Sequence, residues 1–256
     1  MNGDIIGDIS MLDLTERVTV DEPHDREECR RLKKKTLARI CVGKAGDRYK
    51  TETMLRLRAD HAVAMDAVWS SVDEKVVDDL DFIKVQTLIR DKDEYLTRPD
   101  LGRRFSDETI GYVKENCLHN PDVQIIAADG LSSPAIEKNI SDIYPVLVDG
   151  LTAKGYTIGT PIFVRFGRVA TMDKISEALN AKVTILLVGE RPGLATGESM
   201  GCYMAYEASP QKPESQRTVV SNIHKNGTPP VEAGAHIVSI VEIIMDKKLS
   251  GVELKL

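Results

Sequence analysis

Short apolar runs alternate with helix-forming segments through residues 101–256, and this alternation restricts the fold more than any other feature of the sequence. Apolar residues dominate 123–128, 162–166 and 183–188, and a further extended segment covers 202–206. The strands of a parallel sheet are buried on both faces, so they appear as continuous apolar runs, and helices connect them. The pattern therefore predicts an α/β domain with a mainly parallel sheet.

Residues that favour helix ends separate these runs. Ser106 and Asp173 are each suited to cap a helix, because their side chains accept hydrogen bonds from the free N–H groups of a first turn. A serine followed by a proline, as at 133–134, is the preferred order at a helix start. The expected helices are 107–117, a segment from Ser133, 142–154 before Gly155, 174–180, and a last one opened by Thr228 and Pro229 and closed by Gly251.

The first hundred residues are expected to be mostly helical. The charge run at 25–39 is typical of a solvent-exposed helix, and 51–71 carries apolar residues at helical spacing. Its apolar positions include Met54, Leu57, Val63 and Val68. A short helix near 73–80 and an extended segment near 85–90 follow. The predicted parts are an N-terminal extension over 1–35, a small helical domain over 36–100 and the sheet domain over 101–256.

The composition argues against several classes of function. The formal net charge is −6 and there is no basic stripe, so nucleic acid is not an expected partner. No apolar run reaches transmembrane length, and the first residues lack the basic start and apolar middle of a signal peptide. We therefore expect a cytoplasmic protein with no membrane partner.

The four cysteines and five histidines indicate neither a disulfide framework nor a metal site. The cysteines are far apart and form no C-x-x-C pair, which is typical of reduced thiols, and no H-x-x-x-H pair occurs. The chain also lacks a P-loop and a G-x-S-x-G nucleophile elbow. We expect no complete catalytic set and no metal ligand from this chain.

A ligand site is expected at the carboxyl ends of the strands, where open α/β sheets bind ligands. Three turns lie there, at 129–130, 167–169 and 189–193. Each combines a polar or charged residue with glycine, which lets a ligand approach the backbone closely. The alternative is that the glycines only provide turn geometry, and the turns by themselves leave both readings open.

Five motifs in one order and spacing resemble the small (light) subunit family of ethanolamine ammonia-lyase. They are YLTRPDLGRR at 95–104, ADGLS at 128–132, FVRFGRV at 163–169, LVGERPGL at 187–194, and SNIH followed by GTPPVEA within 221–233. The resemblance covers about residues 36–256, and residues 1–35 show none.

The resemblance implies a Rossmann-like C-terminal domain beside a small, mostly helical N-terminal domain. It also implies a heteromeric carbon–nitrogen lyase in which a large, barrel-shaped subunit holds ethanolamine and performs the chemistry. In this family adenosylcobalamin lies between the two subunits, and the radical that it provides starts the conversion of ethanolamine to acetaldehyde and ammonia.

Three cofactor contacts carry over by position from the family, at Val169, Glu190 and Val219. Val169 and Glu190 follow predicted strands, where the sheet argument independently expects a ligand. The family carries cysteine at the position of Val219, so a contact that depended on sulfur would be lost here. Glu190 would accept hydrogen bonds from amide or hydroxyl groups of the corrin; the alternative is an ion pair with Arg191 or Arg168.

No residue of this chain is expected to bind cobalt, because the D-x-H-x-x-G motif of some cobalamin proteins is missing. A competing hypothesis is a non-catalytic Rossmann-like protein that binds a nucleotide or serves as a scaffold. The spacing of Gly189, Gly193 and Gly197 is unlike the dinucleotide fingerprint, which disfavours that hypothesis.

The family resemblance also implies a location inside a bacterial microcompartment for ethanolamine utilization. The segment Ile5–Leu12 has apolar residues at roughly helical spacing and would suit a targeting peptide. Gly3 and Gly7 oppose a helix there, and a frayed tail is the alternative.

Overall fold

The computed structural model describes residues 17–255, which form two compact units. The first unit contains the described residues up to Asp66 together with Gly193–Thr196, and the second contains the rest of the described chain. The possible targeting segment Ile5–Leu12 lies outside the described residues.

The sequence predicts three parts, with boundaries after residues 35 and 100. These boundaries concern which segments fold by themselves, and they stay a prediction. In the structure, segments on both sides of residue 100 belong to the second unit.

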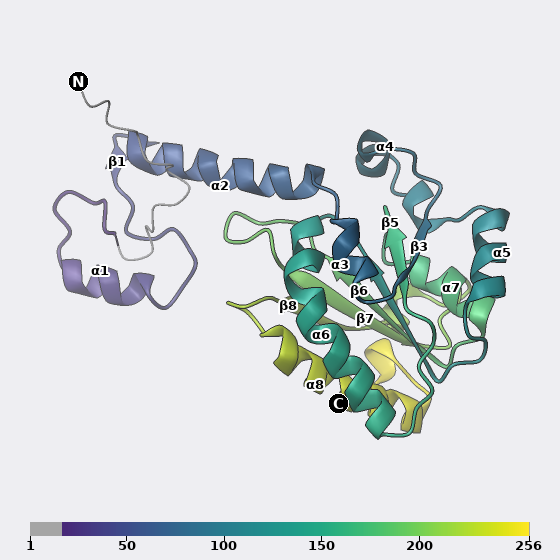
Figure 1. The fold of residues 1–256 in the computed structure, drawn as a ribbon. Coiled ribbons are helices and arrows are strands. Elements are labelled where there is room, and N and C mark those ends of the chain that lie inside the picture. Colours follow the sequence, from purple (N-terminus) through teal and green to yellow (C-terminus); the bar gives the residue numbers. More distant parts are fainter. Residues whose placement is uncertain (1–16, 256) are drawn as a thin grey trace. The chain divides into compact units, whose positions relative to one another are not determined.

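The second unit is built on a six-stranded sheet with the order β3-β5-β4-β6-β7-β8 (Figure 1). The strands are β3 (Ile83–Gln86), β4 (Val123–Ala128), β5 (Ile162–Arg165), β6 (Val183–Gly189), β7 (Met200–Tyr206) and β8 (Thr218–Ile223). Strands β3, β5, β4 and β6 run parallel, whereas β7 is antiparallel to both β6 and β8. The predicted α/β class is confirmed, and the sheet is mixed rather than mainly parallel at its β7-β8 side.

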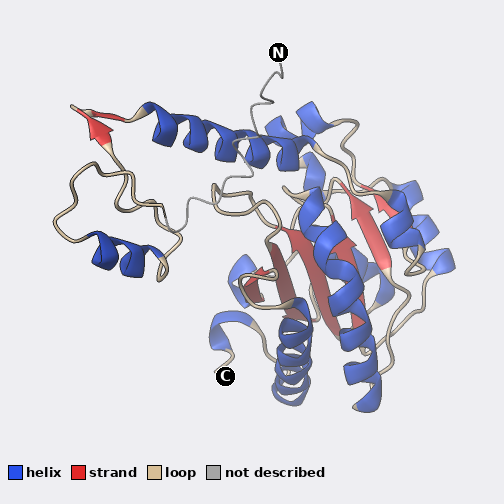
Figure 2. Ribbon diagram, turned by 60° about the vertical axis from the view of Figure 1, so that its left-hand side comes forward, coloured by secondary structure: helices blue, strands red, loops and turns tan. Residues whose placement is uncertain are grey.

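Helices cover both faces of this sheet (Figure 2). One face packs against α6 (Ser133–Ala153) and α8 (Pro230–Lys247), and the other packs against α5 (Asp107–Asn116) and α7 (Thr171–Leu179). We call them the α6 face and the α7 face. Successive residues of a strand point to opposite faces, and because both faces are covered, β4 and β6 are buried throughout their length and almost entirely apolar.

The start of α6 differs from the sequence prediction. One continuous helix replaces the two expected segments, and Pro145 lies inside it. Its cap is Ser132 rather than Ser133, with the Ser132 hydroxyl accepting a hydrogen bond from the Ala135 amide at 3.3 Å. The expected cap of α5 by Ser106 is confirmed, since its hydroxyl accepts from the Thr109 amide at 3.1 Å.

The last two helices also begin at other residues than expected. Helix α7 starts at Thr171, so Asp173 lies inside its first turn instead of capping it. Helix α8 starts at Pro230 with Pro229, not Thr228, at the cap position. It ends at Lys248, which has a left-handed backbone, before the expected Gly251.

The described residues before β4 also contain the four helices α1 to α4 and a small hairpin. The first unit contains α1 (Arg26–Lys33), the hairpin of β1 (Lys44–Ala45) and β2 (Arg48–Tyr49), and most of α2 (Thr51–Trp69). The second contains α3 (Glu74–Asp78) and α4 (Lys92–Thr97). The helix predicted over the charge run 25–39 covers only Arg26–Lys33, and its side chains are mostly exposed or half-exposed, as expected.

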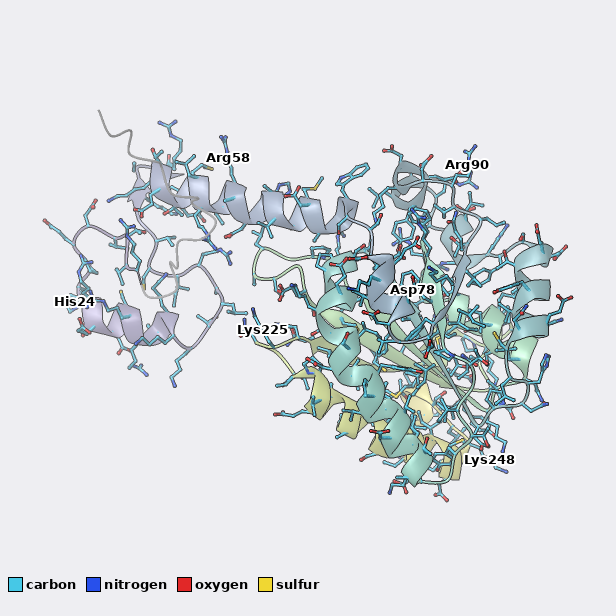
Figure 3. All side chains as sticks on the ribbon, viewed as in Figure 1. His24, Arg58, Asp78, Arg90, Lys225 and Lys248 are labelled. Carbon is cyan, nitrogen blue, oxygen red and sulfur yellow. The ribbon has the colours of Figure 1, made fainter. Side chains whose placement is uncertain are left out.

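Helix α2 exposes several apolar side chains, including Met54 and Val63 of the apolar positions that predicted this helix. Met54, Leu55, Val63, Met65 and Trp69 are 37–50% exposed. Charged side chains such as Arg58 also project from this helix (Figure 3). Within residues 17–255, each helix is too short or too polar to cross a membrane.

Candidate functional site

The three glycine-containing turns named by the sequence lie together at one edge of the sheet. They follow β4, β5 and β6, which are parallel neighbours, so their carboxyl ends meet at that edge. Hydrogen bonds connect the turns directly. The Leu131 amide donates to the Gly189 carbonyl at 3.0 Å, which joins the β4 turn to the β6 turn.

Asp129 joins the β4 turn to the β5 turn from a buried position. Its carboxylate accepts hydrogen bonds from the backbone amides of Phe166 at 2.9 Å, Gly167 at 3.0 Å and Gly130 at 2.9 Å. Burial raises the pKa of Asp129 to about 6, although the three amides and Lys92 act in the opposite direction. Asp129, the polar residue of the predicted ligand-binding turn at 129–130, therefore holds the turns together through backbone hydrogen bonds.

The turn after β5 is further fixed by the segment around Tyr95. The Tyr95 hydroxyl donates to the Gly167 carbonyl at 2.9 Å from a fully buried position. The Arg168 guanidinium donates to the Tyr95 carbonyl at 2.8 Å and lies 4.1 Å from the centre of the Tyr95 ring. No sequence pattern indicates this contact, because the two segments are more than seventy residues apart.

Val169 is half-buried just before α7 and packs against the core of the α7 face. Tyr203 of β7 packs against the same core. The structure therefore places Val169 on one side of the sheet with Tyr203, at the carboxyl edge of β5.

Glu190 follows β6 and is half-buried. Its carboxylate accepts hydrogen bonds from the Ser199 hydroxyl at 2.6 Å and from the Asn222 amide at 3.4 Å. A side chain at Gly201 would begin 2.9 Å from the Glu190 carboxylate, so glycine at that position leaves the room it needs.

The ion pair proposed as the alternative role of Glu190 is not formed with Arg168, whose guanidinium bonds to Tyr95 instead. Nor does any ion pair between Glu190 and Arg191 occur within the described chain.

Val219 lies on β8, a strand that the sequence reading did not identify. It pairs with Tyr203 in the β7-β8 register, so both side chains point to the α7 face, and Val219 is 46% exposed. Burial raises the pKa of the Tyr203 hydroxyl, and the nearby Glu190 carboxylate raises it further. Tyr203 is thus the common neighbour of Glu190 and Val219.

A buried ion pair connects β8 to α7. The Arg217 guanidinium, one residue before β8, lies 2.7 Å from the Asp173 carboxylate, and both side chains are less than 10% exposed. Burial raises the pKa of Asp173, although Arg217 acts against that shift. This pair brings Val219 and the start of α7, after Val169, onto one side of the sheet.

The three sequence-predicted residues, two valines and one half-buried carboxylate, therefore all lie on the α7 side of the sheet, and we call them the proposed cofactor surface. This surface can accept hydrogen bonds and cover an apolar ligand edge. Among residues 17–255, no three His, Cys, Asp or Glu side chains lie close enough to hold a metal ion. That this chain provides no cobalt ligand stays a prediction.

Comparisons with known proteins identify relatives over nearly the whole chain. A family model described as ethanolamine ammonia-lyase light chain (EutC) matches residues 26–255. A relative from Clostridium acetobutylicum is 67% identical over 230 residues, covering 90% of this chain and 95% of the relative. Relatives from Clostridium tetani and Listeria monocytogenes are each 52% identical and cover 98% of this chain and 85% of their own. All three relatives are named ethanolamine ammonia-lyase small subunit.

Proposed function

This chain belongs to the ethanolamine ammonia-lyase light chain family, and from that premise we propose that it works as the small subunit of such a lyase. It would help convert ethanolamine to acetaldehyde and ammonia together with a large subunit that houses the reaction. The alignment with small subunits along 90% of the chain is the observation that carries this proposal.

Val169, Glu190 and Val219 fit a role in holding adenosylcobalamin. When bound, this cofactor supplies the radical that starts the reaction. Glu190 is half-buried and oriented by Ser199, so it can accept hydrogen bonds from neutral amide or hydroxyl groups. Val169 and Val219 add apolar surface, and Val219 is exposed enough to contact a ligand.

The sulfur of the family's cysteine is replaced here by two methyl groups at Val219. The contact at this position would then consist of packing and backbone contact alone.

We also infer that the sheet unit is Rossmann-like. Four parallel strands with helices on both faces support this description. Val169 and Glu190 lie at the carboxyl edge of those strands, which is where folds of this type bind ligands, whereas Val219 pairs with Tyr203 in the middle of β7.

Co-expression with a large subunit tests the function. We expect acetaldehyde from ethanolamine only when both chains and adenosylcobalamin are present, and no product from either chain alone. Nucleotide binding by the lone chain, without activity in the mixture, would instead support a nucleotide-binding or scaffold protein.

The cofactor contact is tested in the assembled complex with Glu190→Ala. We expect weaker cobalamin binding, measured by equilibrium dialysis of the corrinoid, because a hydrogen bond to a charged group contributes about 1.5–3 kcal/mol. Glu177→Ala, at an exposed residue of α7, is the control. Unchanged cobalamin affinity in Glu190→Ala would defeat the proposed contact.

We also propose that this subunit is located inside a bacterial microcompartment and that the segment 5–12 targets it there. Deleting residues 1–20 should then separate the lyase from shell protein in fluorescence images. Continued co-localisation after the deletion would rule out this targeting role.

A further inference from the structure

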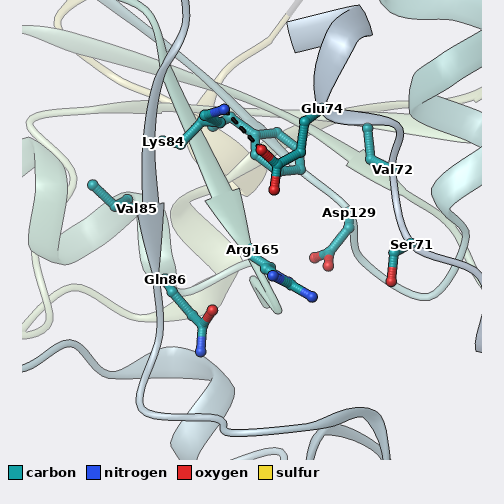
Figure 4. A pocket seen from close by; sticks show the side chains of 9 residues that line it. Ser71, Val72, Glu74, Lys84, Val85, Gln86, Asp129 and Arg165 are labelled. Carbon is teal, nitrogen blue, oxygen red and sulfur yellow. Dashed lines mark hydrogen bonds and ion pairs between the residues drawn. The ribbon is translucent and has the colours of Figure 1, made fainter. Parts of the chain in front are cut away.

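A pocket of about 290 Å³ lies at the carboxyl ends of β3 and β5 (Figure 4). Val169, Glu190 and Val219 do not line it. Its wall includes Phe163, which belongs to the core of the α6 face, and Arg165, which lies two residues later on the same strand and so points to the same face. The pocket is therefore on the opposite side of the sheet from the proposed cofactor surface.

Arg165 is an exposed cation in this pocket with no carboxylate partner among residues 17–255. Its guanidinium lies 5.1 Å from the centre of the Phe166 ring. The other cation of the wall, Lys84, is already paired with Glu74 at 3.0 Å and Asp78 at 2.9 Å. Arg165 is thus the group left to bind an anion.

The one acidic residue beside Arg165 cannot easily serve as its partner. Both oxygens of Asp129 already accept hydrogen bonds from backbone amides. Close to Asp129 lies Lys92, whose ammonium group is buried and has no hydrogen-bond partner in the described chain. Lys92 acts on the Asp129 carboxylate electrostatically, and Arg165 in turn acts on Lys92, so positive charge gathers near this carboxylate.

The remaining wall offers hydrogen bonds and an apolar surface. Figure 4 shows Arg165, Asp129 and Ser71 around one space, with Gln86 at its border. The Gln86 amide donates to the Ile89 carbonyl at 2.7 Å, which leaves its oxygen available to a donor. Phe163, which belongs to the core of the α6 face, and Val72, which packs against that core, form the apolar part of the wall.

We propose that this pocket binds a small organic oxyanion, a carboxylate or a phosphate ester, whose charged group is held by Arg165. The planar guanidinium forms two parallel hydrogen bonds to such a group, which a lysine does not. The neutral part of the ligand would lie against Phe163 and Val72. The volume is at the lower end of that found for small-molecule sites, which suits a ligand of few atoms.

Phenyl phosphate is the probe, because it combines an oxyanion with an apolar ring. Phosphorus NMR titrations use the full chain in its complex with a large subunit. We expect saturable binding at one site per small subunit and weaker binding of inorganic phosphate, which lacks the ring. In Arg165→Gln the dissociation constant should rise about tenfold or more, since a charged hydrogen-bonded pair is lost.

Two matched variants make the test specific. Arg104→Gln removes an exposed arginine of the same unit that lies outside the pocket, and it should leave binding unchanged. Arg165→Lys keeps the charge and should still weaken binding, because the bidentate geometry is lost. Circular dichroism checks that each variant is folded.

Several outcomes would overturn this inference. They are non-saturable binding, equal weakening by Arg104→Gln, or tight binding in Arg165→Gln. Failure of Arg165→Gln to assemble with the large subunit, with no phenyl phosphate binding by the wild-type complex, would assign Arg165 to the subunit interface instead. The readout is binding, so none of these results bears on ethanolamine deamination, which tests the proposed function.

Discussion

At the scale of single residues, Asp129 is a buried carboxylate that holds together the turns after β4 and β5. Its two oxygens accept three backbone hydrogen bonds, and one donor, Phe166, has a positive φ of 56° that is uncommon for a residue with a side chain. In Asp129→Asn one oxygen becomes an NH₂ group that faces a backbone N–H. We expect the free energy of unfolding in urea to fall by about 1–3 kcal/mol, the cost of an unsatisfied buried polar group.

The control is Asp149→Asn, an exposed residue of α6, whose unfolding free energy should stay close to that of the wild type. The pH dependence gives a second readout at Asp129. Its folded pKa of about 6 lies above the ordinary 3.8, so the folded state holds this proton more tightly than the unfolded state. The stability from Asp129 is therefore fully present below pH 3.8 and is lost as pH rises through 6.

The difference in unfolding free energy between wild type and Asp129→Asn should therefore become smaller as the pH rises from 3.8 to 6. A difference that widened over that interval would contradict the assigned direction of the pKa shift.

At the scale of elements, the Arg217–Asp173 pair ties the edge strand β8 to helix α7. Arg217→Ala leaves the Asp173 carboxylate buried without its partner, which typically costs about 3–5 kcal/mol. We expect a loss of about that size in urea unfolding. Adding Asp173→Ala should recover part of the loss, because the remaining buried charge is removed.

The exposed pair of Arg98 and Asp100 provides the comparison. Arg98→Ala should change stability little, since solvent screens exposed ion pairs. If Arg98→Ala and Arg217→Ala were equally destabilising, the buried pair would have no special role in fixing β8.

The elements also show what the sequence can and cannot predict. Strands β4, β5 and β6 were predicted because most of their residues are buried and apolar, which leaves a nearly continuous apolar run in the sequence. Strand β8 was missed because it is an edge strand whose residues are mostly exposed or half-exposed, so no continuous apolar run marks it. Asp173 was taken for a cap because the sequence does not reveal that Arg217, 44 residues away, is its partner.

The candidate site shows the same contrast between features that local sequence indicates and features that depend on distant segments. Val169 and Glu190 could be placed from strand ends and family motifs, since both depend on local sequence. The contacts of Tyr203, Tyr95 and Asp129 could not be predicted, because they join segments that meet only in the folded chain. The family position at Val219 came from the resemblance alone, and the strand that carries it was found only in the structure.

At the scale of the whole molecule, the apolar side of α2 predicts where the large subunit binds. Met54 and Met65 are about three helical turns apart, and Trp69 is one turn further, so they share a side of the helix. Each is at least 37% exposed, although apolar groups in a row favour burial against a partner. We expect Met54→Glu with Met65→Glu to weaken assembly with the large subunit about tenfold or more, because charges cannot be buried without cost.

Val63→Glu is the matched control for this prediction. Val63 is 50% exposed like the others but lies on the other side of α2, two residues and therefore more than half a turn from Met65. Analytical ultracentrifugation of the two chains gives the affinities, and thermal unfolding of the lone small subunit should be nearly unchanged in all variants. Equal weakening by Val63→Glu would show that any added charge on α2 disturbs assembly, and full affinity in the double variant would place the partner on another surface.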